Sequence, residues 1–174
     1  MPLVENSIEV PSWPDVQARL VRAQRLVTEN DLELLRDDCH ECSVAHQVAC
    51  YLRAEFPDWH VDCEFNLEGQ NRDPKKNSRG TRVRPDIIVH RRGPDGLNLV
   101  VLEVKKKTSR VGEKAWNSEI DETRAKLADY QQTQRYVFPV LLTCAVGPPP
   151  AFDSPELVCE LAYGFSVPGS MDEA

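Results

Sequence analysis

Two neighbouring segments of the chain, residues 84–91 and 97–106, carry apolar residues at consecutive positions rather than at alternating ones. Strands of this kind are buried on both faces, which requires helices on each side of the sheet that contains them. Gly93-Pro94-Asp95-Gly96 stands between the two segments and is typical of a tight turn. The pattern therefore predicts a strand pair at the centre of a helix-covered sheet.

The remaining segments supply helices and further strands for this sheet. Apolar residues at helical spacing predict helices over 14–27, 31–37, 38–55 and 116–136. Short apolar runs predict strands at 59–67, 139–146 and 157–165. The polar segment 69–81 predicts a flexible basic loop, and the tail from Pro168 is expected to be disordered.

We therefore expect an α/β fold with a central mixed sheet of four to five strands flanked by helices. The 174 residues suit one domain. Within it we expect an N-terminal helical extension (14–37), a core (38–146), and a C-terminal segment with a tail (147–174).

Three charged residues interrupt the central strand pair: Asp86, Glu103 and Lys105. If the turn is centred between Pro94 and Asp95, Asp86 lies directly opposite Glu103, with Lys105 on the same face; a three-residue loop would break this register. Opposite residues have Cβ atoms about 5 Å apart. Two carboxylates at that distance repel each other unless a cation lies between them, and Mg²⁺ or Mn²⁺ suits carboxylate and water ligands.

Pro85-Asp86, sixteen further residues and then Glu103-Val104-Lys105 resemble the signature of the PD-(D/E)XK nuclease superfamily. The order helix, three strands, helix, strand is also similar to the core of that superfamily, and the resemblance covers about residues 38–146. It implies the restriction-endonuclease-like fold and Mg²⁺- or Mn²⁺-dependent hydrolysis of phosphodiester bonds. It further implies that Asp86 and Glu103 hold the metal, with the Val104 carbonyl as a further ligand, and that Lys105 assists the attacking water.

Two more parts of the superfamily pattern have weaker counterparts. Many members carry a metal-ligating Glu on the first core helix, and Glu41 lies on the same helical stripe as the apolar residues of 38–55. The alternative is a first-turn Glu favoured by the helix dipole. Lys126, Tyr130 and Gln131 resemble the Tyr/Gln motif of the exonuclease-like branch, which makes Tyr130 and Gln131 candidates for nucleic-acid contact. Their alternative is an ordinary amphipathic helix surface.

The charge of the chain is unevenly distributed. The net charge is -7, yet residues 72–110 contain twelve Lys and Arg against four Asp and Glu. An acidic body argues against a general nucleic-acid coat protein, whereas a basic island favours a local site for a polyanion. The alternative is a solvated basic loop. The candidates for backbone contact are Lys75, Lys76, Arg79, Arg82, Lys106 and Lys107.

Other chemistries have less support in the sequence. Cys39-His40-Glu41-Cys42 is a CxxC motif that could serve redox chemistry or, with His46, Cys50 or Cys63, hold zinc, but buried and unreactive cysteines are favoured because no second CxxC follows. The two histidines at 40 and 46 are too far apart for an HExxH protease motif. No GxSxG elbow and no Gly-rich phosphate loop is present.

The sequence thus predicts a Mg²⁺-dependent nuclease, with DNA favoured over RNA as substrate. The alternatives are a non-catalytic nucleic-acid-binding or regulatory module on the same fold, and a subunit that needs a partner protein or a second copy for activity. No apolar run reaches the 18 residues of a membrane helix, and the N-terminus lacks the pattern of a secretory signal. We expect a cytoplasmic protein with six reduced cysteines and no membrane partner.

Overall fold

The computed structural model describes residues 9–68, 73–93, 96–147 and 157–161. The centre of the expected turn at 94–95, the proline run at 148–150 and the tail from Pro168 lie outside the described residues. None of the described helices is long and apolar enough to cross a membrane.

The described elements comprise four helices and seven strands. The helices are α1 (Trp13–Asn30), α2 (Leu32–Arg36), α3 (Glu41–Glu55) and α4 (Glu113–Gln134). The strands are β1 (His60–Cys63), β2 (Leu67–Glu68), β3 (Asp73–Pro74), β4 (Ile87–His90), β5 (Asn98–Thr108), β6 (Phe138–Val146) and β7 (Leu157–Leu161).

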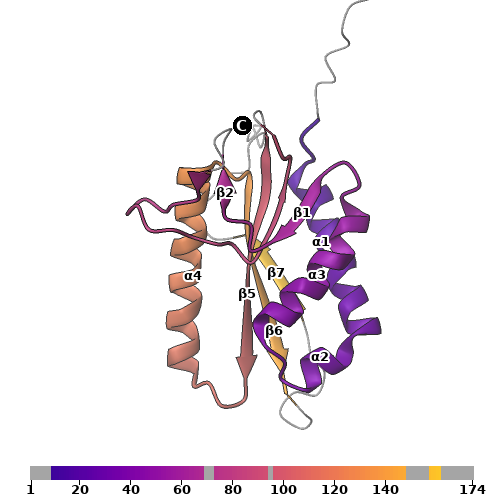
Figure 1. Ribbon diagram of the computed structural model, residues 1–174. Helices are drawn as coiled ribbons and strands as arrows, with labels where there is room; N and C mark the ends of the chain where they lie inside the picture. The colour runs from indigo at the N-terminus through magenta and orange to yellow at the C-terminus, as the bar shows by residue number, and fades with distance from the viewer. Residues whose placement is uncertain (1–8, 69–72, 94–95, 148–156, 162–174) are drawn as a thin grey trace, which may run out of the picture.

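Five strands form the central sheet in the order β1-β4-β5-β6-β7, and β2 and β3 pair separately. The β5–β6 pair is parallel and the other neighbours in the central sheet are antiparallel, so the sheet is mixed. Figure 1 shows α4 on one face of this sheet and α1, α2 and α3 on the other. The expected α/β fold, with a mixed sheet flanked by helices and N-terminal helices added, is confirmed.

The central strand pair has the register that the turn predicts. Ile87 lies opposite Leu102 and Ile88 opposite Val101, and the register shifts only at His90. One step before Ile87, the same register places Asp86 opposite Glu103. Both faces of the pair are buried, as the continuous apolar runs predict.

Successive residues of β5 pack into two separate cores. Val100, Leu102 and Val104 face α1 and α3, where the predicted apolar stripe of α3 is entirely buried. Val101 faces α4 and packs with Leu127 and other residues of that helix. Since alternate residues of a strand point to opposite faces, Glu103 and Lys105 share the α4 side with Val101.

Several predicted boundaries are wrong, and the backbone explains why. The expected strand 59–67 ends at Cys63, because Glu64 adopts a left-handed conformation with φ of 48° and turns the chain. Helix α3 begins three residues later than expected, since Asp38 is also left-handed. Arg135 is left-handed and ends α4 before 136. The expected flexible loop 69–81 is partly ordered, with β3 and a bridge between Lys76 and Arg82.

Candidate active site

The candidate site lies where β5 continues beyond the start of β4, so that one edge of β5 is left without a strand partner. Two carboxylates take the free backbone N–H groups of this edge. Asp86 Oδ2 accepts from Val104 N–H at 2.7 Å, and Glu41 Oε1 accepts from Lys106 N–H at 3.1 Å. Asp86 comes from the end of a loop and Glu41 from the first turn of α3. Both therefore lie at the same edge of β5, where the N–H groups that they bind belong to residues two positions apart.

The carbonyl of Val104 belongs to the same edge. In a strand, the N–H and C=O of one residue point to the same side, and the Val104 N–H points to Asp86. The register places Pro85 opposite Val104, and proline has no N–H to donate. By this register, the Val104 carbonyl accepts no backbone hydrogen bond from residue 85.

Glu103 is the most deeply buried charge at the site, with 1 % of its surface exposed. Its Oε2 accepts from Lys126 Nζ at 2.6 Å, whereas its buried Oε1 has no hydrogen-bond partner among the described residues. Burial, together with the nearby Asp86 carboxylate, raises the pKa of Glu103 to about 7, although Lys126 opposes the shift. Burial also raises the pKa of Asp86. At both carboxyls, burial therefore outweighs the nearby lysines, which favour the ionised form.

Lys105 lies between two carboxylates that come from opposite layers of the fold. Its Nζ is 3.5 Å from Glu41 Oε2 on α3 and 3.4 Å from Glu119 Oε1 on α4. Burial disfavours the charge on Lys105, but these carboxylates outweigh it and raise the pKa. Lys105 is therefore protonated at neutral pH and can act as a hydrogen-bond donor and a positive charge, not as a base.

The arrangement does not contain a ready-made cluster of ligands. Among the described residues, no group of three or more His, Cys, Asp and Glu side chains is close enough to hold a metal ion. What fits a cation is the pair Asp86 and Glu103 with the Val104 carbonyl, because Oε1 of Glu103 is buried and has no hydrogen-bond partner among the described residues. Both oxygens of Glu41 are engaged, one by the Lys106 N–H and one by Lys105. Water would complete the coordination of Mg²⁺ or Mn²⁺.

Two of the predicted nucleic-acid contacts are wrong. Lys75 is only 2 % exposed, and its Nζ donates to the Tyr136 hydroxyl beneath the loop that sequence alone assigned to the surface. Tyr130 is fully buried against the sheet, where burial and the charges of Glu103 and Asp86 raise the pKa of its hydroxyl. Neither side chain reaches a surface on which nucleic acid could bind.

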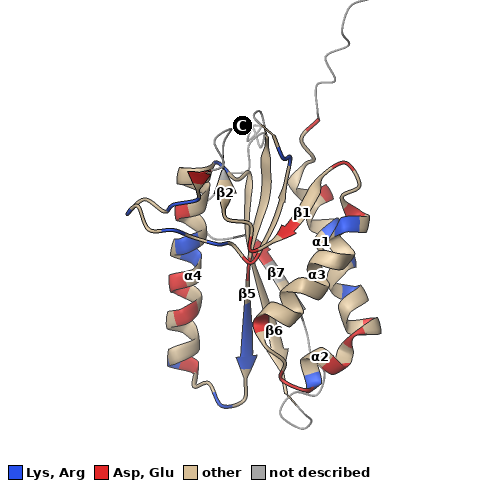
Figure 2. Cartoon of the chain, in the orientation of Figure 1, with Lys and Arg blue, Asp and Glu red and all other residues tan. Residues whose placement is uncertain are grey.

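Three further candidates are half-buried and take part in contacts within the fold. Lys106 Nζ is 2.7 Å from Asp38 Oδ1 and also donates to two backbone carbonyls before α3. Lys107 Nζ lies over the Trp116 ring at 5.7 Å. Gln131 donates to the Val137 carbonyl at 3.4 Å. Figure 2 shows these lysines as the blue end of β5, next to acidic residues of the neighbouring layers.

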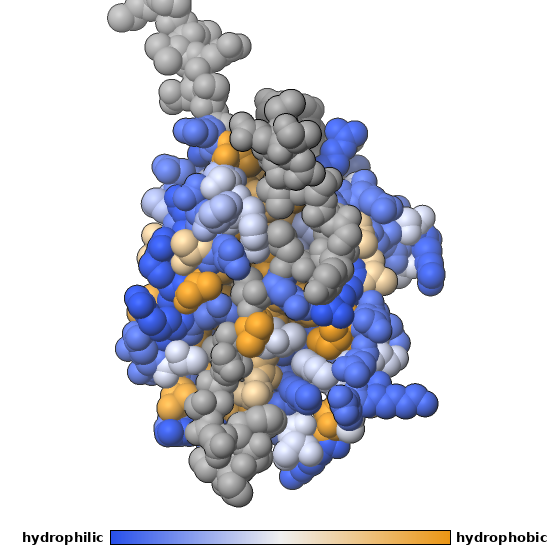
Figure 3. All heavy atoms as spheres, turned by 180° about the vertical axis from the view of Figure 1, so that it is seen from behind, coloured by the Kyte–Doolittle hydropathy of each residue, from blue (hydrophilic) through white to orange (hydrophobic). Residues whose placement is uncertain are grey.

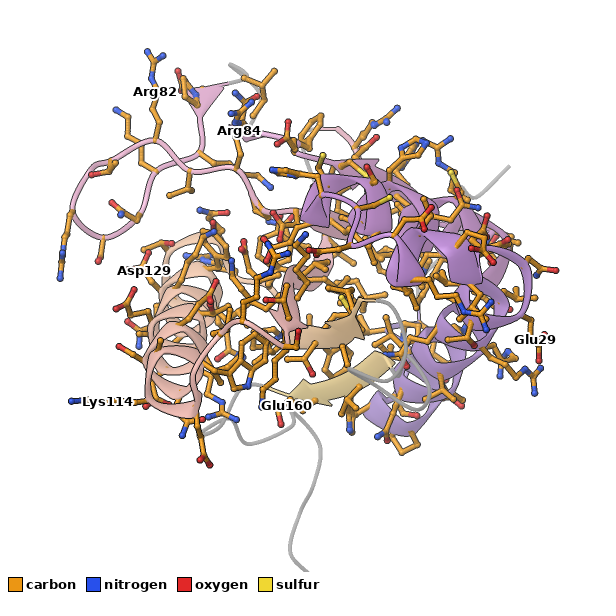
Figure 4. The ribbon with its side chains drawn as sticks, turned by 90° about the horizontal axis from the view of Figure 1, so that it is seen from below. Glu29, Arg82, Arg84, Lys114, Asp129 and Glu160 are labelled. Carbon is orange, nitrogen blue, oxygen red and sulfur yellow. The ribbon has the colours of Figure 1, made fainter. Side chains whose placement is uncertain are left out.

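The remaining candidates for backbone contact lie on residues 75–84, which we call the basic arm. Lys76, Arg79 and Arg82 are all exposed, and the bridge between Lys76 and Arg82 holds the arm as a narrow hairpin. Ser78 N–H donates to both oxygens of the Asp129 carboxylate and so ties the arm to α4. Figure 4 shows Arg82 and Arg84 on this arm, beside the helix that carries Asp129. The arm leads directly into Asp86.

The cysteines differ from the prediction in burial but not in bonding. All five described cysteines are free thiols, and only Cys144 is buried, whereas Cys42, Cys50 and Cys63 are exposed. Cys50 Sγ lies 3.6 Å from His46 Nε2, but no third ligand joins them to form a zinc site within the described residues.

Two residues of α4 take part in the site in ways that the sequence did not predict. Glu119 contacts Lys105, and Lys126, which was singled out only for its resemblance to the Tyr/Gln motif, contacts Glu103. They stand seven residues apart, which places them on one side of a helix. For Glu119 this spacing is the only signal in the sequence, and it is shared by many charged pairs on solvent-exposed helices.

Comparison with known proteins adds no assignment. No protein-family model matches the chain, and no curated protein is similar to it in sequence.

Proposed function

We propose that this chain is a divalent-cation-dependent nuclease that hydrolyses phosphodiester bonds in nucleic acid, with DNA favoured over RNA. One observation carries the proposal. At the open edge of β5, the Asp86 carboxylate accepts from the Val104 backbone, and the neighbouring Glu103 is buried with one oxygen that has no hydrogen-bond partner in the described part of the chain. These are the residues on which the resemblance to the PD-(D/E)XK superfamily rests.

Asp86, Glu103 and the Val104 carbonyl would hold the cation, and Glu41 could hold a second one after releasing Lys105. A divalent cation bound there supplies Lewis acidity towards a phosphate and makes a water molecule more acidic. The raised pKa of Glu103 supports this role. It shows that ionising this buried carboxyl without a cation costs free energy, and a bound cation would offset that cost. Cation binding therefore releases a proton near neutral pH, and affinity rises with pH.

Lys105 supplies the fixed positive charge of the proposed reaction. Two carboxylates keep it protonated and restrain its ammonium group on both sides. It would donate to the attacking water or to a phosphate oxygen and offset the negative charge that develops on phosphorus. A base role is unsuited to it, since its pKa is raised rather than lowered.

The basic arm would position the nucleic acid. Lys76, Arg79 and Arg82 are exposed and lie immediately before Asp86 in the chain. Contacts of this kind go to phosphates and fix the position of the substrate without selecting a sequence. The same surface would serve a binding module that does not cleave, which is the second candidate function. We place the nuclease in the cytoplasm, where free cysteine thiols stay reduced.

The test is a cleavage assay on labelled single- and double-stranded DNA and RNA with Mg²⁺, Mn²⁺ or EDTA. We expect cleavage that requires the cation and is lost in Glu103→Gln and Lys105→Met. Lys114→Met is the matched control, because Lys114 is an exposed lysine on the outer side of α4 in Figure 4. Cation binding without cleavage of any substrate would favour a missing partner or a second copy. A folded protein that neither binds the cation nor cleaves any of the substrates would refute the proposal.

A further inference from the structure

Lys126 contacts a carboxylate of the site but has no role in the proposed reaction. It extends from α4 and places its Nζ 2.6 Å from Oε2 of Glu103 and 5.6 Å from the centre of the Tyr130 ring. The side chain of Lys126 is 43 % exposed, whereas that of Glu103 is 2 % exposed. A solvent-accessible lysine thus reaches inward to the most buried carboxylate of the site.

The ammonium group of Lys126 contacts the same carboxylate that a divalent cation would need. A metal ion bound to Glu103 and Asp86 would lie next to Lys126, and two positive charges at that distance repel each other. The two cations therefore compete for Glu103. Lys105 pairs with Glu41 in the same way that Lys126 pairs with Glu103.

Of the three lysines nearest the carboxylates, Lys126 is the one that can leave. Lys105 is held between Glu41 and Glu119, and Lys106 is held by Asp38 and by backbone carbonyls. For Lys126, Glu103 is the single ion-pair partner among the described residues. Because its side chain is 43 % exposed, its ammonium group can move from Glu103 into solvent.

Once released from Glu103, the ammonium group of Lys126 is available to pair with another anion. The proposed substrate provides one, because a phosphate held at the cation would lie beside α4, within the region that Lys126 leaves. An ammonium group binds phosphate oxygens as a compact charge with three donors. Moving from Glu103 to a phosphate would exchange one ion pair for another.

We propose that Lys126 is a positioning residue that balances the charge of Glu103 in the absence of metal and transfers to a substrate phosphate when the cation binds. This inference rests on the proposed nuclease function. It makes metal binding and nucleic-acid binding mutually dependent, since each ligand favours the state in which Lys126 has left Glu103. Such couplings are reciprocal and usually amount to 5- to 150-fold in affinity.

The experiment is a Mn²⁺ titration by calorimetry of the full chain, wild type against Lys126→Met and the control Lys114→Met. Lys126→Met keeps the aliphatic length and removes the charge. We expect it to bind Mn²⁺ about tenfold more tightly than the wild type, and the control to bind as the wild type does. A lysine with a purely structural role would leave the affinity unchanged or weaken it. Lys126→Gln repeats the test if the first variant does not fold, which circular dichroism checks.

A second arm measures the transfer to phosphate. The affinity for a short labelled DNA duplex is measured with EDTA and with Ca²⁺, and a denaturing gel confirms that the duplex stays intact. We expect Ca²⁺ to strengthen duplex binding by the wild type and by Lys114→Met, but clearly less by Lys126→Met. An equal gain in all three proteins would overturn the transfer to phosphate.

The outcomes separate the two proposals. If the wild type binds Mn²⁺ and Lys126→Met binds it equally or more weakly, the competition is refuted while the metal site stands. If none of the three folded proteins binds Mn²⁺, the proposed metal site is refuted, and this inference with it.

Discussion

The buried Glu103 makes a specific prediction about how the stability of the metal-free protein depends on pH. Burial and the neighbouring Asp86 raise its pKa from 4.5 to about 7. A carboxyl with a raised pKa in the folded state binds its proton more tightly there than in the unfolded chain. Its contribution to stability is therefore fully present below pH 4.5 and is lost as the pH rises through about 7. Glu103→Gln removes this titration but keeps the shape of the side chain.

The size of the effect follows from the shift. Each pKa unit corresponds to 1.36 kcal/mol, so a shift from 4.5 to about 7 is worth about 3 kcal/mol. Because Glu103 is 1 % exposed, solvent screening reduces this value little. The free energy of unfolding of the wild type, minus that of Glu103→Gln, should fall by about 3 kcal/mol from below pH 4.5 to above pH 7.

The assay is urea unfolding in EDTA from below pH 4.5 to above pH 7 for both proteins. Taking the difference between them cancels the titrations that they share. Glu122→Gln, which changes an exposed carboxylate on α4, is the control and should run parallel to the wild type. Parallel curves for Glu103→Gln and the wild type would show that Glu103 is ionised at little cost, and the electrostatic reasoning about the site would be wrong.

Three further predictions concern the reaction, the basic arm and the far end of β4. Lys105→Met should lower the rate of cleavage by about 10²-fold or more with Mn²⁺ affinity retained, measured by single-turnover kinetics and calorimetry. Arg82→Ala should reduce the slope of log affinity for duplex DNA against log salt by about 0.9, measured by anisotropy at several salt concentrations. Burial lowers the pKa of His90 although its partner Asp62 opposes the shift, so its contribution to stability is present above pH 6.5 and lost as the pH falls through its lowered pKa. His90→Gln should flatten that loss in urea unfolding, and an unchanged profile would contradict the assignment.

The centre of the fold could be predicted because it depends on local patterns. The apolar runs of β4 and β5 and the turn between them determine the register, which places Asp86 opposite Glu103. The apolar stripe of α3 determines which face packs on the sheet, and it carries Glu41 to the edge of β5. Patterns with a period of two or 3.6 residues need no knowledge of distant contacts.

The errors arise where a distant residue decides the outcome. Lys75 stands in a basic, polar segment, but its Nζ bonds to Tyr136, sixty-one positions along the chain. The contact between Lys126 and Glu103 spans twenty-three positions and joins a helix to a strand. Glu64 turns the chain in a left-handed conformation that its residue type does not favour. Tertiary contacts of this kind leave no periodic signal in the sequence.

The exposed hydrophobic residues bear on how nucleic acid would bind. Exposed large hydrophobic residues in the described part of the chain are Val10, Val21, Leu97 and Val158, none of them aromatic. On the face in Figure 3, hydrophobic side chains are scattered among hydrophilic ones. Proteins that hold single strands usually stack bases on exposed aromatic rings. The phosphate contacts that we propose for the basic arm would be made without such rings among the exposed large hydrophobic residues of the described part.

The most direct test of the central claim is a Mn²⁺ titration of the wild type and Asp86→Asn by calorimetry at pH 8, with Asp58→Asn as a control at an exposed position. We expect saturable Mn²⁺ binding by the wild type and by the control, and Mn²⁺ binding that is lost or strongly weakened in Asp86→Asn. A folded wild type that does not bind Mn²⁺, or an Asp86→Asn variant that binds it as the wild type does, would contradict a metal site at the open edge of β5.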